Sequence, residues 1–161
     1  MARTSGIAIG LAAVLAMGAC TKADPPRDPV EHRTKAEVKA DVQAQADQVA
    51  KLVGYPLQNA KVDPALCLYP KGKTNDGSVF VMQGSYEIAL PEGQHISTGA
   101  KVRDAWKAAG WTITKDDTKA KTVEMVATTP KKFTVRLGST EPPKALVLLV
   151  QSTCYRDTAK S

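Results

Sequence analysis

Residues 145–150, ALVLLV, constrain the fold of this chain more than any other segment. A strand with one face in water alternates apolar and polar side chains, but this segment is apolar at every position. A strand of this composition lies in the middle of a sheet, or its second face is covered. We therefore expect residues 145–154 to form a central or covered strand.

Short polar turns separate this strand from three further strand candidates. These candidates are residues 111–115, 122–128 and 133–137. In the last of them, Phe133, Val135 and Leu137 share one face, and the residues between them are polar. Strands joined by short turns pair as antiparallel neighbours. The C-terminal part of the chain is therefore predicted to form a meander of four strands.

Two more strand candidates precede these four. Residues 78–90, SVFVMQGSYEIAL, alternate between apolar and polar side chains, which predicts a strand with one mostly wet face. Gly84, in the middle of this segment, predicts a bulge or a bend. Residues 65–69, ALCLY, are a short strand candidate between two prolines and carry Cys67.

Two segments have the apolar spacing of amphipathic helices. Residues 34–53 begin with the capping-box pair Thr34 and Glu37, and Gly54 follows them. The apolar face of this segment is light, built mainly from valine and alanine, so we expect the helix to lie across a sheet. Residues 98–109 form the second predicted helix, which ends at Gly110.

Trp106 and Trp111 flank the end of the second predicted helix. They occupy the two positions that touch when a helix ends in a Schellman motif. We interpret both as core residues, because large aromatic side chains are mostly buried in domains of this size. A pair of aromatic rings lining a binding cleft is the functional alternative.

The predicted order is helix, strand, strand, helix and then four strands. This order indicates an α+β fold, a two-layer sandwich with one mainly antiparallel sheet and two helices on one of its faces. The sheet would combine the C-terminal meander with the N-terminal strand or strands. Residues 34–161 are expected to form a single domain.

The N-terminus has the layout of an export signal. Arg3 precedes an apolar run over residues 6–18, and Cys20 follows the small residues at its end. The run is shorter than the about 20 apolar residues that a membrane-spanning helix needs. Residues 17–20, MGAC, resemble the lipobox of bacterial lipoproteins. The resemblance implies removal of residues 1–19 and lipidation of Cys20; an ordinary secretory signal is the alternative.

Residues 20–33 are predicted to form the lipidated cysteine and a disordered tether. The sequence TKADPPRDPVEHR has three prolines, alternating charges and few apolar residues. Such a segment buries too little apolar surface to become ordered, and its prolines keep it semi-extended. With lipid on Cys20, the tether would hold the domain at the extracytoplasmic face of the cell membrane.

Cys67 and Cys154 remain when Cys20 carries the lipid. In an oxidising compartment an even pair of cysteines predicts a structural disulfide. The bond would close a loop of about 87 residues, which corresponds to a stabilisation of up to about 4–5 kcal/mol. A redox pair or a pair of metal ligands is the alternative, although both chemistries favour closely spaced residues.

The formal net charge of +6 comes mostly from lysines spread along the chain. This distribution predicts good solubility. Attraction to anionic lipid head groups or to an anionic cell-wall polymer is the functional alternative. We expect no nucleic-acid partner, because no basic stretch alternates with aromatic residues and an exported protein does not meet nucleic acid.

His95 is a candidate catalytic residue, since Ser97 or Thr98 could act as its nucleophile. No nucleophile elbow, orienting carboxylate or glycine-rich phosphate loop accompanies it. We interpret Asp116 and Asp117 as solvated turn residues rather than as a glycosidase pair. The sequence has no cluster with metal-ligand spacing. We therefore expect no catalytic residues, no metal and no cofactor, and a protein that is not an enzyme.

A further resemblance covers about residues 54–161. The segments YEIALPEG, VRDAWKAAGW and ALVLLVQSTCY, together with Cys20, are similar to a group of small, uncharacterised actinobacterial lipoproteins. The resemblance implies membrane anchoring and an α+β domain pinned by a disulfide. It assigns no activity.

These features together predict a non-enzymatic binding or interaction module anchored at the cell envelope. Its partner would be an envelope protein or an anionic polymer, bound by the wet face of the sheet or by an edge strand. A carrier of lipid or of another hydrophobic ligand is the alternative. A hydrolase that uses His95 is less favoured.

Overall fold

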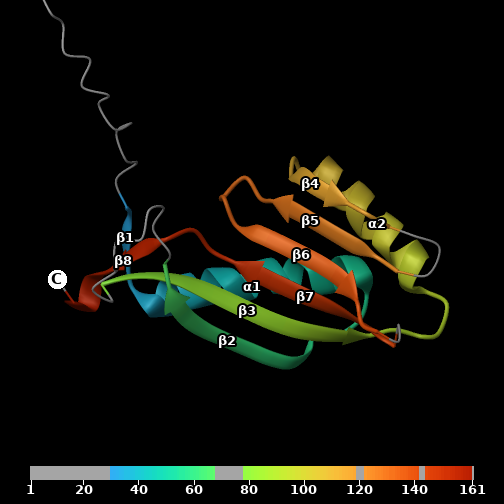
Figure 1. Cartoon of the computed structure of the whole chain (residues 1–161), viewed down its shortest axis with the longest axis horizontal. Coiled ribbons are helices and arrows are strands. Elements are labelled where there is room, and N and C mark those ends of the chain that lie inside the picture. The colour runs from blue at the N-terminus through green and yellow to red at the C-terminus, as the bar shows by residue number, and fades with distance from the viewer. Residues whose placement is uncertain (1–29, 68–77, 119–121, 142–143, 161) are drawn as a thin grey trace, which may run out of the picture.

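The computed structural model describes residues 30–67, 78–118, 122–141 and 144–160 (Figure 1). The predicted signal peptide, Cys20, most of the tether and the predicted turn over residues 71–77 lie outside these ranges. The described residues form a mixed α+β fold with a curled sheet of eight strands and two helices. The predicted α+β class is therefore confirmed.

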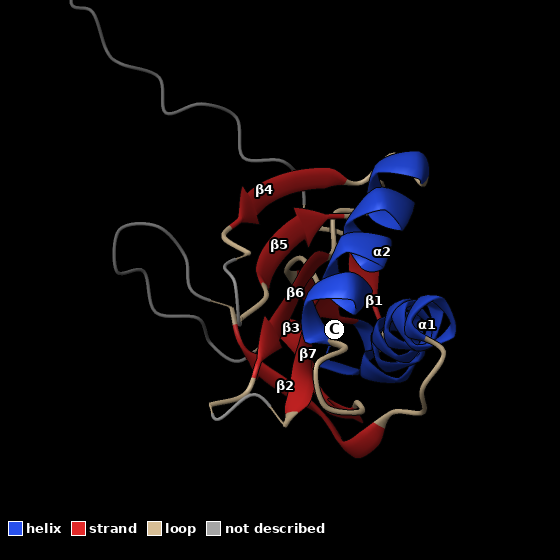
Figure 2. Cartoon of the chain, turned by 90° about the vertical axis from the view of Figure 1, so that its right-hand side faces the viewer, coloured by secondary structure: helices blue, strands red, loops and turns tan. Residues whose placement is uncertain are grey.

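The helices are α1 (Lys35–Val53) and α2 (His95–Ala108), and a short 3-10 helix, Thr158–Lys160, follows the last strand. Both helices lie on the same side of the sheet (Figure 2). The strands are β1 (His32–Arg33), β2 (Gln58–Leu66), β3 (Val79–Ala89), β4 (Thr112–Asp116), β5 (Glu124–Thr128), β6 (Thr134–Ser139), β7 (Ala145–Gln151) and β8 (Tyr155–Asp157).

Helix α1 begins and ends where the sequence predicts. The Glu37 N–H donates to Thr34 Oγ1 (3.2 Å), and the Thr34 N–H donates to Glu37 Oε2 (2.8 Å), which completes the capping box. Gly54 closes the helix in the left-handed region with φ of 85°. The buried face of the helix is the predicted one and consists of Val38, Val42, Ala46, Val49 and Val53.

Helix α2 begins at His95, three residues before the predicted start at Thr98. The Thr98 N–H already donates to the Gln94 carbonyl oxygen (3.0 Å), so residues 95–97 belong to the first turn. The C-terminal end is the predicted Schellman motif. The Trp111 N–H donates to the Trp106 carbonyl (2.9 Å), and Gly110 has φ of 74°.

Strand β7 lies between β3 and β6 and pairs antiparallel with both. The prediction that the apolar segment 145–150 forms a central strand is therefore confirmed. Strand β5 pairs antiparallel with β6 on one side and with β4 on the other. The core lies between the sheet and the helices, and it includes Trp106 of α2, Leu148 of β7 and Tyr86 of β3.

Strand β3 is the longest strand and organises the N-terminal half of the sheet. One edge of β3 pairs with β2, and the other edge pairs first with β8 and then with β7. Strands β7 and β8 therefore lie end to end along the same neighbour, with residues 152–154 between them. Strand β1 runs parallel to β8, with His32 opposite Arg156.

Two predictions for the N-terminal half were wrong in their boundaries. His32 and Arg33, predicted as the end of the tether, form β1, because the backbone of β8 offers them hydrogen-bond partners. The strand predicted over residues 65–69 is instead Gln58–Leu66, because pairing with the long β3 extends it toward the N-terminus. Residues 68 and 69 lie outside the described ranges.

Gly84 does not mark a bulge in β3, contrary to the prediction. The register of β3 with β7 is continuous past Gly84, and the irregularity lies in β2, between Gln58 and Lys61. A Cβ atom on Gly84 would lie 2.7 Å from Val42 Cγ1 of α1. The glycine is therefore required because the helix packs closely on the strand at this point.

Replacing Gly84 with alanine is expected to lower the free energy of unfolding by about 1–3 kcal/mol, the usual cost of overpacking a close-packed interior. The added methyl group would also meet Tyr86 at 2.8 Å, so two neighbours must move. Urea denaturation measures the change. The matched control is Ser85→Ala on the exposed face of the same strand, which is expected to change stability by less than about 0.5 kcal/mol. Equal effects of the two substitutions would contradict the packing argument.

Candidate functional site

The predicted disulfide between Cys67 and Cys154 is present. It joins the end of β2 to the junction between β7 and β8, across a sequence separation of 87, with Cα atoms 5.8 Å apart. Cys67 is only 4% exposed, whereas Cys154 is partly exposed. The pair therefore staples segments that are distant in the sequence, as expected. Cys20, the predicted lipidation site, lies outside the described residues.

His95 is 5% exposed and is the first residue of α2. Within the described ranges its Nε2 atom has no hydrogen-bond partner. The hydroxyl of Ser97, one of the two predicted nucleophiles, donates to the Gln94 carbonyl (3.1 Å) rather than to the imidazole. Thr98, the other, is buried in the first turn of the helix. The structure therefore does not join these residues into a base and nucleophile pair.

The two tryptophans at the end of α2 are core residues, as predicted. Trp106 is fully buried and Trp111 is 7% exposed. Their rings stack with centroids 5.1 Å apart and planes at 22°. The pair therefore holds the end of α2 against the core.

Asp116 takes part in the local structure of its turn. Arg103 of α2 donates to Asp116 Oδ2 (3.3 Å), and the Thr118 hydroxyl donates to Oδ1 (3.0 Å). Desolvation raises the pKa of Asp116, but the hydrogen bonds from Thr118 and Arg103 outweigh it and lower the pKa overall. In the part of the chain that the structure describes, no group of three or more His, Cys, Asp or Glu residues could hold a metal ion.

The helix-free face of the sheet carries apolar side chains at its centre. Leu149 of β7 is 38% exposed, and Val147 on the same face is half-buried. Leu149 pairs with Ser85 of β3 on one side and with Arg136 of β6 on the other. Figure 1 views the sheet from this face, with α1 behind it. We call Leu149, Val147 and their cross-strand neighbours the helix-free face.

Leu149 separates two hollows on the helix-free face. One has a volume of about 390 Å³ and extends over β2 and β3 to Lys61 and Asp63. The other has a volume of about 360 Å³ and extends over β5 and β6 to Glu124 and Arg136. Charged side chains at the margins of both hollows place them on the surface of the molecule rather than in its interior.

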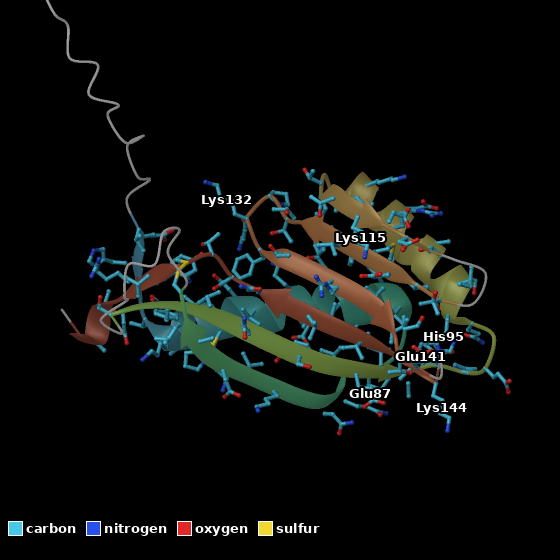
Figure 3. All side chains as sticks on the ribbon, viewed as in Figure 1. Glu87, His95, Lys115, Lys132, Glu141 and Lys144 are labelled. Atoms are coloured by element: carbon cyan, nitrogen blue, oxygen red, sulfur yellow. A yellow bond between two sulfur atoms is a disulfide. The ribbon has the colours of Figure 1, made fainter. Side chains whose placement is uncertain are left out.

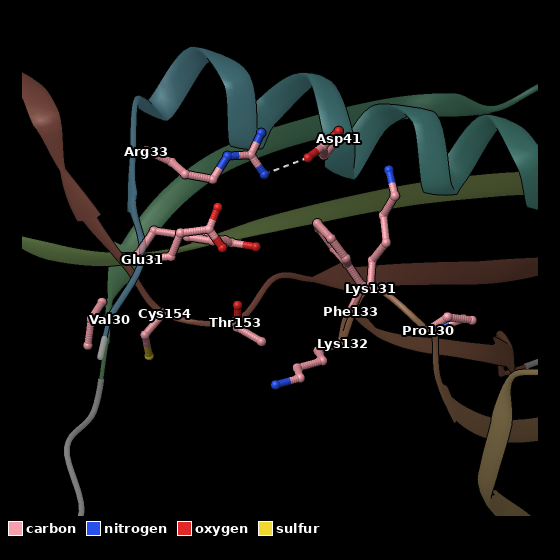
Figure 4. Close-up of a pocket in the computed structure, with 11 residues that line it drawn as sticks. Val30, Glu31, Arg33, Asp41, Pro130, Lys131, Lys132, Phe133, Thr153 and Cys154 are labelled. Atoms are coloured by element: carbon pink, nitrogen blue, oxygen red, sulfur yellow. Dashed lines mark hydrogen bonds and ion pairs between the residues drawn. The ribbon is translucent and has the colours of Figure 1, made fainter. Parts of the chain in front are cut away.

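A third hollow, with a volume of about 640 Å³, lies where the sheet is interrupted. Strand β6 stops pairing with β7 at Gln151, and β1 begins to pair with β8 at Arg156. Between these points the edge of residues 152–154 faces a gap. We call this gap the notch. It is lined by residues 30, 31 and 33 on one side, by the turn at residues 130–133 on the other, and by Asp41 and residues 153–155 (Figure 4).

The two sides of the notch carry opposite charges. Glu31 lies on the β1 side, and Lys131 and Lys132 lie on the turn between β5 and β6. None of these three side chains forms an ion pair within the described ranges, because the notch separates them. Arg33 also lines the notch, but its Nη1 donates to Asp41 (2.6 Å), and this hydrogen bond raises the pKa of Arg33.

The sequence reasoning missed the notch. It treated Glu31 and Arg33 as tether, and it counted residues 152–154 as part of one continuous strand. Lys132 and His95 lie well apart in the molecule, so the notch is also distant from the one predicted catalytic candidate (Figure 3). A run of two lysines after a proline was the available signal, and it is equally typical of an ordinary turn.

No helix in the described ranges is long and apolar enough to cross a membrane. The chain matches no family model, and neither the curated proteins nor the solved structures compared with it give a significant match.

Proposed function

We propose that this protein is a membrane-anchored, extracytoplasmic lipoprotein that acts as a non-enzymatic binding module at the cell envelope. The export-type N-terminus and the cysteine at position 20 support the anchor. The Cys67–Cys154 disulfide supports an oxidising compartment. In this proposal the domain is a two-layer sandwich whose four C-terminal strands form a meander and whose second sheet face is left for a partner.

The observation that carries the proposal is the exposed apolar centre of the helix-free face. A strand with one face in water normally has polar side chains on that face, yet β7 has Val147 and Leu149 on it. Each has a small neighbour on one side, because Leu149 lies opposite Ser85 on β3 and Val147 lies opposite Gly138 on β6. A partner can therefore reach the apolar side chains across the sheet, and surfaces of this kind are typical of interaction sites.

Charges surround this apolar centre and would orient a partner. Arg136 lies beside Leu149, and Glu87 lies beside Val147 on the next strand. An apolar centre with a charged rim is the usual arrangement of a protein–protein interface. An envelope protein fits this surface better than an anionic polymer does, because a polymer would need a face of uniformly positive charge.

The test is photo-crosslinking from position 149 in cells that produce the full chain from its own locus. A photoreactive amino acid at position 149 is expected to yield one discrete crosslinked species. The same amino acid at Lys39, an exposed position of α1, is the matched control and is expected to yield none. Val147→Lys is expected to reduce the crosslink at least fivefold. Identical products from positions 149 and 39 would overturn the role of this face.

The anchor is tested separately, so that its failure can be distinguished from failure of the binding face. Protein extracted from membranes is expected to have lost residues 1–19 and to carry the added mass of acyl chains. The Cys20→Ser variant is expected to leave the membrane fraction. A protein that keeps residues 1–19 and remains soluble in the cell would remove the anchor and its compartment.

A further inference from the structure

We infer that the notch binds a short, zwitterionic oligopeptide in an extended conformation, as an inserted strand between β1 and β6. The inference does not depend on the helix-free face, which lies over other parts of the sheet. It depends on three observations: the length of the interruption in the sheet, the unpaired backbone groups along it, and the opposite charges at its two ends.

The interruption has the length of a short peptide. Strand β6 pairs with β7 as far as Gln151, and β1 pairs with β8 from Arg156 onward. At about 3.3 Å per residue, the four residues between these points span about 13 Å, which is the length of an extended peptide of three to four residues. The volume of about 640 Å³ lies within the range of small-ligand sites.

The floor of the notch has two adjacent backbone N–H groups without an acceptor among the described residues. Because successive N–H groups of an extended chain point to opposite edges, one of them can pair with a strand in the notch. Over the ranges that the structure describes, the N–H groups of Thr153 and Cys154 donate no hydrogen bond, whereas the Ser152 N–H donates to Met82 on β3 (2.9 Å). Both residues are partly exposed. Backbone groups that lack a neighbouring strand are the template for adding a peptide strand.

The charges fix the direction of the peptide. Lys131 and Lys132 lie at the end of the notch where β6 begins, and Glu31 lies at the end where β1 begins (Figure 4). A free carboxylate would contact the lysines, and a free ammonium would contact the Glu31 carboxylate. The peptide would therefore run antiparallel to β8. Thr153, whose hydroxyl forms no hydrogen bond with described residues, lies between these two ends.

The walls of the notch are held in place without a ligand. Arg33 is fixed by Asp41 and lies over the Tyr155 ring, 5.3 Å from its centroid. At the start of α1, Lys35 Nζ lies 3.0 Å from Oδ2 of the buried Asp157. These contacts tie β1 to β8 and to α1. The site is therefore largely preformed, which lowers the entropic cost of binding.

The test is an NMR titration of the full-length, isotope-labelled chain in detergent micelles, with trialanine carrying free termini as the probe. Saturable shifts are expected at the amides of Thr153 and Cys154. Trialanine that is acetylated and amidated is expected to bind at least tenfold more weakly, because it has lost both charges. Peptides blocked at one end only are expected to give intermediate affinities.

Variants assign the two ends of the peptide. The double variant Lys131→Gln/Lys132→Gln is expected to weaken binding of trialanine about tenfold while leaving binding of trialanine amide unchanged. Glu31→Gln is expected to weaken binding of trialanine and of its amide, but not of the N-acetylated form. All three side chains are exposed, so these changes leave the fold intact. Lys101→Gln on α2 is the matched control and is expected to have no effect.

Three outcomes would overturn the inference. The first is the absence of any saturable shift at Thr153 and Cys154 up to 20 mM probe, on the order of the weakest specific affinities. The second is equal affinity of the free and the doubly blocked peptide. The third is that sodium acetate alone reproduces the shifts with the same affinity, which would indicate an adventitious ion only.

Discussion

Replacing both Cys67 and Cys154 with alanine is expected to lower the free energy of unfolding by about 3–5 kcal/mol. The bond joins residues separated by 87 positions, so its loss frees a long loop in the unfolded chain. A loss of this size is a large part of the total stability of a domain of this length. Urea denaturation monitored by circular dichroism gives the value.

Two controls separate the bond from the packing of the sulfur atoms. Cys67 is 4% exposed, so alanine at this position also removes buried volume. Reducing agent breaks the bond in the wild-type chain but leaves the sulfur atoms in place. Reduction alone is expected to cause most of the fall in the free energy of unfolding. The double variant should not respond to reducing agent at all. A wild-type protein whose unfolding midpoint is the same with and without reducing agent would contradict the prediction.

Replacing Trp106 with alanine is expected to lower the free energy of unfolding by about 3–5 kcal/mol, the usual cost of truncating a buried tryptophan. Trp106 is fully buried and stacks on Trp111. Its removal leaves a cavity beneath the end of α2 and takes away the ring against which Trp111 closes the helix. The melting temperature and the urea midpoint are expected to fall together.

Trp106→Phe distinguishes lost volume from the lost indole N–H. The Nε1 atom of Trp106 has no hydrogen-bond partner among the described residues, so removing it sacrifices no bond. The free energy of unfolding of the phenylalanine variant is therefore expected to fall by less than about 2 kcal/mol. Lys107→Ala, at the adjacent exposed position, is the matched control and is expected to change stability by less than about 0.5 kcal/mol. Equal losses in the alanine and phenylalanine variants would contradict the cavity argument.

The parts of the fold that were predicted correctly depend on residues close together in the sequence. The capping box of α1 needs only Thr34 and Glu37, and the ending of α2 needs only Trp106, Gly110 and Trp111. Such motifs satisfy backbone groups within one helical turn, so they can be read without knowing the rest of the structure.

The parts that were missed depend on distant partners. Strands β1 and β8 have two and three residues, too few to show any periodicity, and each exists because the other, or β3, supplies its hydrogen bonds. Gly84 gave a signal that was misread, because a bulge and a closely packed helix both require glycine. Only the position of Val42 decides between the two explanations.

The candidate sites divide in the same way. The apolar composition of residues 145–150 predicted that this strand is central, and it made an apolar second face foreseeable. That no helix covers Leu149 could not be foreseen, because α1 and α2 are amphipathic helices that could have packed on either face. The notch could not be foreseen at all, since Glu31 and Lys132 are brought to its two ends by pairings between different strands.

The sequence by itself determined the two helices, the central strand and the pair of cysteines that bond, because each follows from side-chain periodicity, from a local cap or from the number of available partners. The tertiary structure alone decided which sheet face stays uncovered and where the sheet is interrupted. Both outcomes are set by hydrogen bonds and packing between residues far apart in the sequence, such as His32 with Arg156 and Arg33 with Asp157, which are 124 positions apart. No periodicity along the chain marks such pairings, because strands of two or three residues are too short to show one.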